Sequence, residues 1–289
     1  MTFENRPARA ARASAVAASI ALGSWCFALS AAAQPAVVEQ HTEAVKADAF
    51  QEDVTSLNAS LGAALNTGNT ESWQLNTGST FGLIRGRHGL TLTMDFSYGR
   101  ANVTDDEVDG LVDTVRNLRT KGRYDFFLTP MDALFVASVY RWDTFAGLDA
   151  RVQGQLGYMR NLYKATDHRY WAELGYDLTY DNYDPDPLPD PDNMGVFLDG
   201  DDVVHSVRAF LGYDNKVNAV LTFATGLEGL LNVEDTKDLR LAWDSALRSA
   251  IGGNFQLELK FSLQLDTQPV PGTKKVDTIS TLNLIYTLI

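Results

Sequence analysis

Three basic residues stand at alternate positions in one short stretch of the sequence, Arg119, Lys121 and Arg123. If this stretch is a strand, successive side chains point to opposite faces and these three share one face. A row of fixed cations along a narrow passage selects ions by charge, so the pattern predicts a basic stripe in a pore. The alternative is a set of charges paired with carboxylates that fills a narrow interior, because burying unpaired charge is costly.

Other charged residues follow the same alternation and are expected on the same face as the stripe. The residues that we expect to line this interior and to set its selectivity are Arg119, Lys121, Arg123, Arg141, Arg151, Asp95, Glu173, Asp177, Arg208, Glu228, Asp244, Arg248, Glu258 and Lys260. When Asp125, Asp143, Arg240 and Asp266 are added, cations and anions are equal in number. Equal numbers suit a filled interior as well as an open pore, and both remain possible.

The strands that must carry these residues are visible as alternating segments, of which 255–266, FQLELKFSLQLD, is the most regular. A period of two indicates a strand, and a tilted strand needs about 9 to 11 residues to cross a bilayer. Twelve strands are predicted, at 55–66, 73–83, 90–98, 114–128, 133–143, 149–162, 170–181, 203–213, 219–233, 239–251, 255–267 and 276–289.

These strands predict an all-β fold, a transmembrane antiparallel up-and-down β-barrel of about twelve strands in a bacterial outer membrane. The apolar face would contact lipid and the polar face would line the lumen, whereas a water-soluble barrel would reverse the two faces. The connections favour the membrane barrel, because every second one is short and the others include the long segments 101–113 and 182–202. Aromatic residues near the strand ends also favour the membrane barrel.

The N-terminus has the features of a secretory signal peptide. Arg6, Arg9 and Arg12 precede an apolar stretch, and small residues end it at Ala33. We therefore expect a signal peptide at 1–33, a short periplasmic lead at 34–54 and the barrel at 55–289. The only cysteine, Cys26, would leave with the signal, so the mature chain would have no thiol for a disulfide or a metal site.

Composition excludes two classes of protein. The net charge is −13, and removal of the basic signal makes it more negative, so nucleic acid is not an expected partner. Hydrophobic residues make up 45% of the chain, yet no apolar run of about 18 residues follows the signal, which excludes a helical membrane protein.

Enzyme and metal chemistry have weaker support in the sequence. The segment 181–202 alternates aspartate with proline, and its carboxylates are a weak candidate for Ca²⁺ binding. These carboxylates are Asp184, Asp186, Asp190, Asp192, Asp199 and Asp201. The spacing of these carboxylates is not that of an EF-hand. A solvated loop that proline and like charges keep extended explains the aspartates as well. No serine or histidine motif matches a hydrolase, so we expect no catalytic residue, no cofactor and no enzyme.

The sequence also resembles a known family. The segments RWDTFAGLDARVQGQLGYMRNL at 141–162, SLGAALNTGNTESWQLNTG at 60–78 and VDTISTLNLIYTLI at 276–289 resemble the YdiY-like proteins, salt-induced outer-membrane proteins with domain of unknown function number 481. The resemblance implies an outer-membrane barrel over about 55–289 and implies no activity.

We therefore expect a monomeric barrel that conducts ions or small polar solutes passively. The alternatives are a closed barrel with a structural or salt-stress role in the envelope and, more distantly, a lipid-modifying enzyme. The expected partners are outer-membrane lipid and the barrel-assembly machinery. That machinery reads the last strand, in which Tyr286 would supply the aromatic residue.

Overall fold

The computed structural model describes residues 53–66, 72–102, 111–144, 148–183, 200–268 and 275–289, with the side chains of 64–66 left out. Within these residues the chain forms twelve β-strands. The strands are β1 (Val54–Asn66), β2 (Ser72–Arg85), β3 (His88–Asn102), β4 (Leu111–Phe127), β5 (Asp132–Asp143), β6 (Leu148–Lys164), β7 (His168–Tyr183), β8 (Asp201–Lys216), β9 (Leu221–Asn232), β10 (Leu239–Gly252), β11 (Phe255–Asp266) and β12 (Val276–Thr287). The predicted strand number is confirmed, and the ends differ by a few residues.

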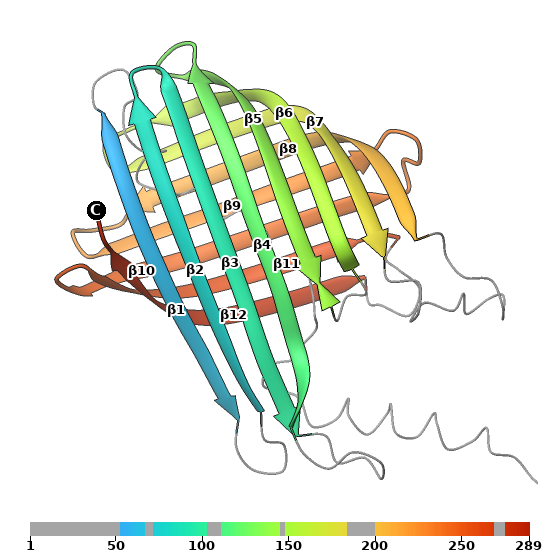
Figure 1. The fold of residues 1–289 in the computed structure, drawn as a ribbon. Helices are drawn as coiled ribbons and strands as arrows, with labels where there is room; N and C mark the ends of the chain where they lie inside the picture. Colours follow the sequence, from blue (N-terminus) through green and yellow to red (C-terminus); the bar gives the residue numbers. More distant parts are fainter. Residues whose placement is uncertain (1–52, 67–71, 103–110, 145–147, 184–199, 269–274) are drawn as a thin grey trace, which may run out of the picture. The chain divides into compact units, whose positions relative to one another are not determined.

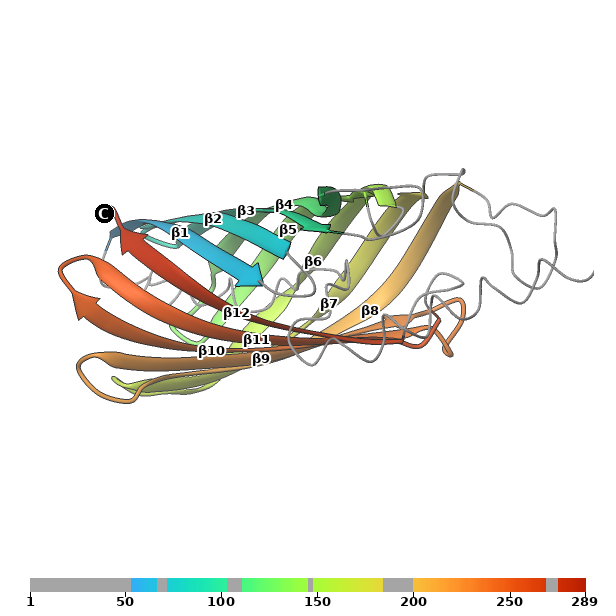
Figure 2. The same cartoon turned by 90° about the horizontal axis from the view of Figure 1, so that it is seen from below.

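The strands form one closed antiparallel barrel in which each strand pairs with its neighbours in the sequence. β12 pairs with β1 and closes the ring, so the predicted up-and-down topology is confirmed. In Figure 1 the strands β1 to β7 form one wall, drawn in blue to yellow, and the orange to red strands β9 to β12 pass behind them at a steep angle. Figure 2 shows the two walls as layers that face each other.

The two faces of the barrel wall are inverted relative to a water-soluble protein. Outward-facing leucines are strongly exposed, for example Leu156 at 59% and Leu174 at 62%. Inward-facing charged residues are buried, and Arg208, Asp181 and Asp244 are each 0% exposed. An apolar outer surface around a charged interior is the arrangement of a barrel that sits in lipid.

The connections at one end of the barrel are short. Gly86 and Arg87 join β2 to β3, and Gly253 and Asn254 join β10 to β11. Gly86 has φ 54° and Gly253 has φ 57°, a left-handed conformation in which a side chain would be strained. Tight turns of this kind favour glycine, and they hold the paired strands in register at what we call the short-turn end. We call the opposite end, where β7 ends and β8 begins, the long-loop end.

The seam between β1 and β12 is paired over a shorter length than the other seams. Its register runs from Asn58↔Thr287 to Gly62↔Asn283, near the short-turn end. Backbone hydrogen bonds between Leu57 and Leu288 and between Leu57 and Ile289 extend it slightly. By comparison, β2 and β3 are paired from Ser72↔Ala101 to Arg85↔His88, along the whole of β2.

Candidate functional site in the barrel interior

The residues predicted to line the interior all lie on the inward face of the wall, but they differ in burial. The structure buries Arg119, Lys121, Arg123, Arg141, Glu173, Asp177, Arg208, Glu228, Asp244 and Glu258 and leaves Asp95, Arg151, Arg248 and Lys260 half-buried. The basic stripe itself is 6% to 7% exposed. Its side chains are therefore packed among other side chains, and their predicted role in selectivity stays a prediction.

Glu173 on β7 lies at the centre of an ionic bridge inside the barrel. It accepts hydrogen bonds from two arginines, with its carboxylate oxygens 3.0 Å from Nη1 of Arg123 and 2.7 Å from Nη1 of Arg208. Arg123 is on β4, so its bond to β7 spans the inner surfaces of β5 and β6. Asp125, at 2.8 Å, also pairs with Arg123, and Glu228 also pairs with Arg208. These ion pairs connect strands that are not neighbours and therefore stabilise this part of the wall from the lumen side.

Aromatic residues that the sequence analysis did not place inside support this bridge. The ring centroid of Phe135 lies 4.2 Å from the guanidinium carbon of Arg123, a favourable cation–π geometry. Phe135 lies against its cross-strand neighbour Gly157, where an added Cβ would come within 2.7 Å of the ring. Trp171 covers its neighbour Gly212 in the same way.

Ala133, Phe135, Met159, Trp171 and Phe210 form one buried apolar cluster in the half of the barrel nearest the short-turn end. Arg169 lies beside this cluster, with its guanidinium carbon 4.1 Å from the ring centroid of Trp171 and Nη2 2.9 Å from Asp214. The sequence signal that could have revealed the cluster is glycine directly opposite an aromatic residue in the register. This part of the interior is therefore packed with apolar as well as charged groups, contrary to the expectation of a polar inward face.

Three arginines form a row across neighbouring strands, which the sequence did not show. Arg119, Arg141 and Arg151 are direct register partners on β4, β5 and β6. Like charges directly opposite one another destabilise a sheet, so the row needs anions beside it. Asp143 lies 2.8 Å from Nη2 of Arg141, and Asp181 lies 2.6 Å from Nη2 of Arg151. Two of the three arginines, Arg141 and Arg151, are thus paired with carboxylates on the inner wall.

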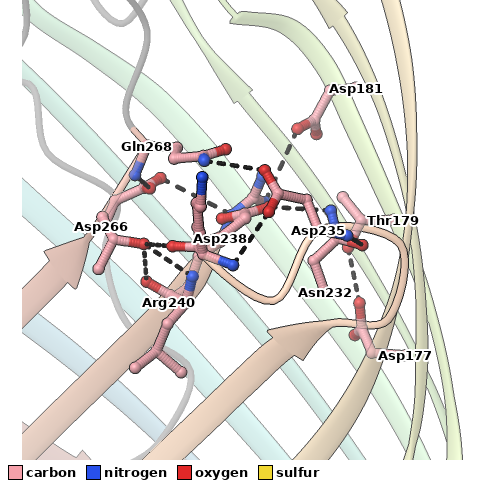
Figure 3. A network of polar contacts seen from close by, with 12 residues as sticks. Asp177, Thr179, Asp181, Asn232, Asp235, Asp238, Arg240, Asp266 and Gln268 are labelled. Carbon is pink, nitrogen blue, oxygen red and sulfur yellow. Dashed lines mark hydrogen bonds and ion pairs between the residues drawn. The ribbon is translucent and has the colours of Figure 1, made fainter.

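A second polar network lies at the long-loop end (Figure 3). Arg240 on β10 stands within 3.7 Å of Asp238 and Asp266 and within 3.9 Å of Asp181 on β7. In the adjoining loop, Gln268 donates a hydrogen bond of 2.9 Å to Asp235, which lowers the pKa of the Asp235 carboxyl from its usual value. Strands three apart in the ring are again connected through the interior.

The wall near the seam differs from the wall that carries these networks. Several inward side chains of β1, β2 and β12 are uncharged, polar and half-buried, among them Asn58, Ser60, Asn76 and Thr281, whereas Ile279 and Ile285 of β12 are apolar. Charged residues of both signs stand beside this region, namely Asp95, Asp244, Arg248, Glu258, Lys260 and Asp277. Arg248 donates to Glu258 at 2.6 Å, Asn283 donates to Glu258 at 3.1 Å, and Lys260 is the register partner of Thr281. The interior thus has a packed, charged side and a more accessible, polar side.

Metal binding and helical membrane spans find no support in the described part of the chain. There, no group of three or more histidine, cysteine, aspartate or glutamate residues could hold a metal ion. Of the weak Ca²⁺ candidates, Asp201 is exposed at the start of β8, and Asp184, Asp186, Asp190, Asp192 and Asp199 lie outside the described residues. The predicted signal peptide and nearly all of the lead also lie outside them. No described helix is both long and apolar enough to cross a membrane.

Comparison with known proteins finds one family model and several solved structures that match this chain. The NanC porin covers 82% of this chain and 100% of its own, at 9% identity and a TM-score of 0.49. The translocator domain of the autotransporter NalP from Neisseria meningitidis covers 83% and 91%, at 13% identity and a TM-score of 0.42. An outer membrane channel from Pseudomonas putida F1 covers 81% and 95%, at 11% identity and a TM-score of 0.45. No curated protein matches the sequence.

The sequence model of one protein family matches nearly the whole barrel. The match runs over residues 59–288, from the first strand to the last, and agrees with the resemblance drawn from the motifs. The chain belongs to this family, DUF481, which is described as a protein of unknown function.

Proposed function

We propose that this protein is a narrow outer-membrane channel for ions or small polar solutes. The membrane location is supported by the exposed leucines of the outer face and by the tyrosines at both of its ends. Tyr158 and Tyr170 lie outward near the short-turn end, and Tyr140 and Tyr180 lie outward near the long-loop end. Two aromatic girdles of this kind mark the interfaces of a membrane barrel.

The observation that carries the proposed conduction is the asymmetry of the interior. Ion pairs and aromatic rings fill the side formed by β4 to β9, whereas β1, β2 and β12 present several half-buried, uncharged polar side chains such as Asn58, Asn76 and Thr281. A polar solute would therefore pass along the seam side, and the charged side would act as a rigid wall.

A closed barrel with a structural role in the envelope is the second candidate. It is favoured by the interior ion pairs, because Glu173, Asp143 and Asp177 are buried and each has hydrogen-bonding partners. A barrel whose interior charges satisfy one another needs no solute to pass through it.

Single-channel conductance of the refolded chain in a planar bilayer, with cysteine modification, separates the two candidates. The chain would start at residue 34, which removes the only cysteine. We expect a negatively charged methanethiosulfonate to reduce the conductance of Ser60→Cys, whose side chain faces the polar side. The outward neighbour Ala59→Cys and the buried Ala137→Cys are the matched controls and should not respond. A barrel that is folded on a heat-modifiability gel but electrically silent would support the closed barrel instead.

A further inference from the structure

The balance of inward charges differs between the two sides of the barrel. On the packed side, β4 to β9, the inward positions of the described strands carry nine cations and eight carboxylates, which nearly cancel. They are Arg119, Lys121, Arg123, Arg141, Arg151, Lys164, Arg169, Arg208 and Lys216, and Asp125, Asp143, Glu173, Asp177, Asp181, Asp202, Asp214 and Glu228. On the polar side, β10 to β12 with β1 to β3, there are three cations and five carboxylates. They are Arg240, Arg248 and Lys260, and Asp95, Asp244, Glu258, Asp266 and Asp277.

Two of the three cations on the polar side are already occupied by carboxylates. Arg248 donates to Glu258 at 2.6 Å. Arg240 stands 3.7 Å from Asp266 and 3.7 Å from Asp238, which precedes β10 (Figure 3). At that point one guanidinium faces two carboxylates, so these two arginines add no positive charge to the polar side.

Lys260 on β11 is the remaining cation, and three carboxylates share the polar side with it. Asp244 lies on β10, Asp277 on β12 and Asp95 on β3. One ammonium group balances one carboxylate. Asp95 is also in register with Arg119 on β4, but the packed side has only one cation in excess. Both sides together therefore still hold more carboxylates than cations, and the excess belongs to the polar side.

The carboxylates of the polar side are spread along the barrel axis. Asp266 and Asp277 lie near the long-loop end, Asp95 and Asp244 near the middle of their strands, and Glu258 toward the short-turn end. A solute that passes along this side would meet a carboxylate at each level. Carboxylates that line a path favour the passage of cations.

Asp95 extends from β3 toward the seam. A Cβ added at Gly78 on β2 would lie 2.7 Å from Oδ1 of Asp95 and 2.7 Å from Oγ of Ser60 on β1. The carboxylate and the hydroxyl therefore approach each other over a position that has no side chain. Both residues are half-buried. A negative charge thus stands directly beside the neutral residues that line the proposed path.

We propose that the polar side of the interior is a path for small cations such as K⁺ and disfavours Cl⁻. The inference rests on the proposed channel function and adds a substrate class to it. The basic stripe, which is packed among other side chains, would then belong to the wall and would not set the selectivity.

The first test is the reversal potential of the refolded chain, from residue 34 onward, in a planar bilayer with a gradient of KCl. The salt stays at or below about 0.1 M, where the Debye length is about 10 Å or more. A unit charge about 8 Å from an ion in water changes the local concentration of that ion about two- to threefold, in opposite directions for K⁺ and Cl⁻. We therefore expect K⁺ to be at least about fivefold more permeant than Cl⁻.

Substitutions that remove charges of opposite sign give this test a direction. Asp277→Asn should lower the ratio of K⁺ to Cl⁻ permeability about fivefold, and Lys260→Gln should raise it by a similar factor. Asp277→Glu keeps the charge and should keep the ratio. Asp132→Asn is the matched control, because it removes a carboxylate from the outer surface and should leave the ratio unchanged. If Asp277→Asn does not fold on a heat-modifiability gel, Lys260→Gln still decides.

Modification of Ser60→Cys tests the path without any current. Mass spectrometry follows its reaction with a positively and a negatively charged methanethiosulfonate, and each rate is divided by the rate of that reagent with a small thiol in solution. The positive reagent should react at least about fivefold faster on this scale, and Asp95→Asn in the same chain should reduce this preference about fivefold. Any effect of Asp95 on the ionisation of the thiol cancels in the ratio. The negative reagent still lowers the conductance once it has reacted, because its bulk narrows the path.

The outcomes distinguish this inference from the proposed function. A conducting barrel that prefers Cl⁻, or has no preference, overturns the cation path and leaves the channel standing. A ratio that changes in neither Asp277→Asn nor Lys260→Gln also overturns the cation path, since other charges would then set the preference. A folded, silent barrel in which Ser60→Cys still reacts faster with the positive reagent overturns conduction and leaves entry of cations standing. A silent barrel with equal relative rates overturns both.

Discussion

Removal of the charge of Glu173 should destabilise the barrel more than any surface change. Glu173→Gln keeps the shape of the side chain but takes a negative charge from between Arg123 and Arg208, whose Nη1 atoms lie 3.0 Å and 2.7 Å from it. At about 3 Å and an effective dielectric constant of about 20, each pair interacts by about 5 kcal/mol, and the cost of desolvation offsets much of this. Since Asp125 and Glu228 remain beside the two arginines, we expect a loss of about 3 kcal/mol.

The assay is reversible urea unfolding of the barrel in vesicles, followed by tryptophan fluorescence. Arg160→Gln is the matched control, because it breaks an ion pair of similar length, 2.9 Å to Asp132, on the exposed outer surface. That change should cost less than about 1 kcal/mol. If Glu173→Gln unfolds at the same urea concentration as Arg160→Gln, the ionic bridge does not stabilise the barrel and the reasoning is refuted.

Two further predictions concern packing and pH. Gly212→Ala would place a methyl group in the indole ring of Trp171 and should cost about 1 to 3 kcal/mol in the same unfolding assay, whereas Gly154→Ala, with open space around it, should be neutral. The lowered pKa of Asp235 means that its bond from Gln268 stabilises the loop above the ordinary aspartate pKa, and that this contribution is lost as pH falls through the lowered value. Gln268→Leu should therefore be less stable than the unchanged chain at neutral pH, and a difference that persists unchanged at acid pH would contradict this assignment.

The fold could be predicted from the sequence because its main determinant is local. Alternation with a period of two identifies each strand, and the apolar residues of the alternation identify its outward face, as in 255–266. The interior could be predicted only in part. Alternation puts Arg123 and Glu173 on the inward face, but it cannot show that they meet, since β4 and β7 are separated by two strands. Which strands meet across the lumen depends on the tilt and stagger of the whole barrel.

The apolar cluster escaped prediction for a different reason. In β5 the residues Leu134, Phe135 and Val136 are all apolar, so polarity does not mark the inward one. The informative signal lies on the next strand, where Gly157 is the register partner of Phe135 and provides the space for its ring. Such a pair can be recognised only after the register is known.

The contact between Trp171 and Gly212 has a consequence for how this barrel can vary. The two residues face each other across β7 and β8, and the indole occupies the volume that any other residue at position 212 would need. Neither position can change size alone without overlap or a cavity. In other members of the family the pair should therefore be inherited as a unit, large opposite small, and an exchange of bulk from one strand to the other should require both changes together.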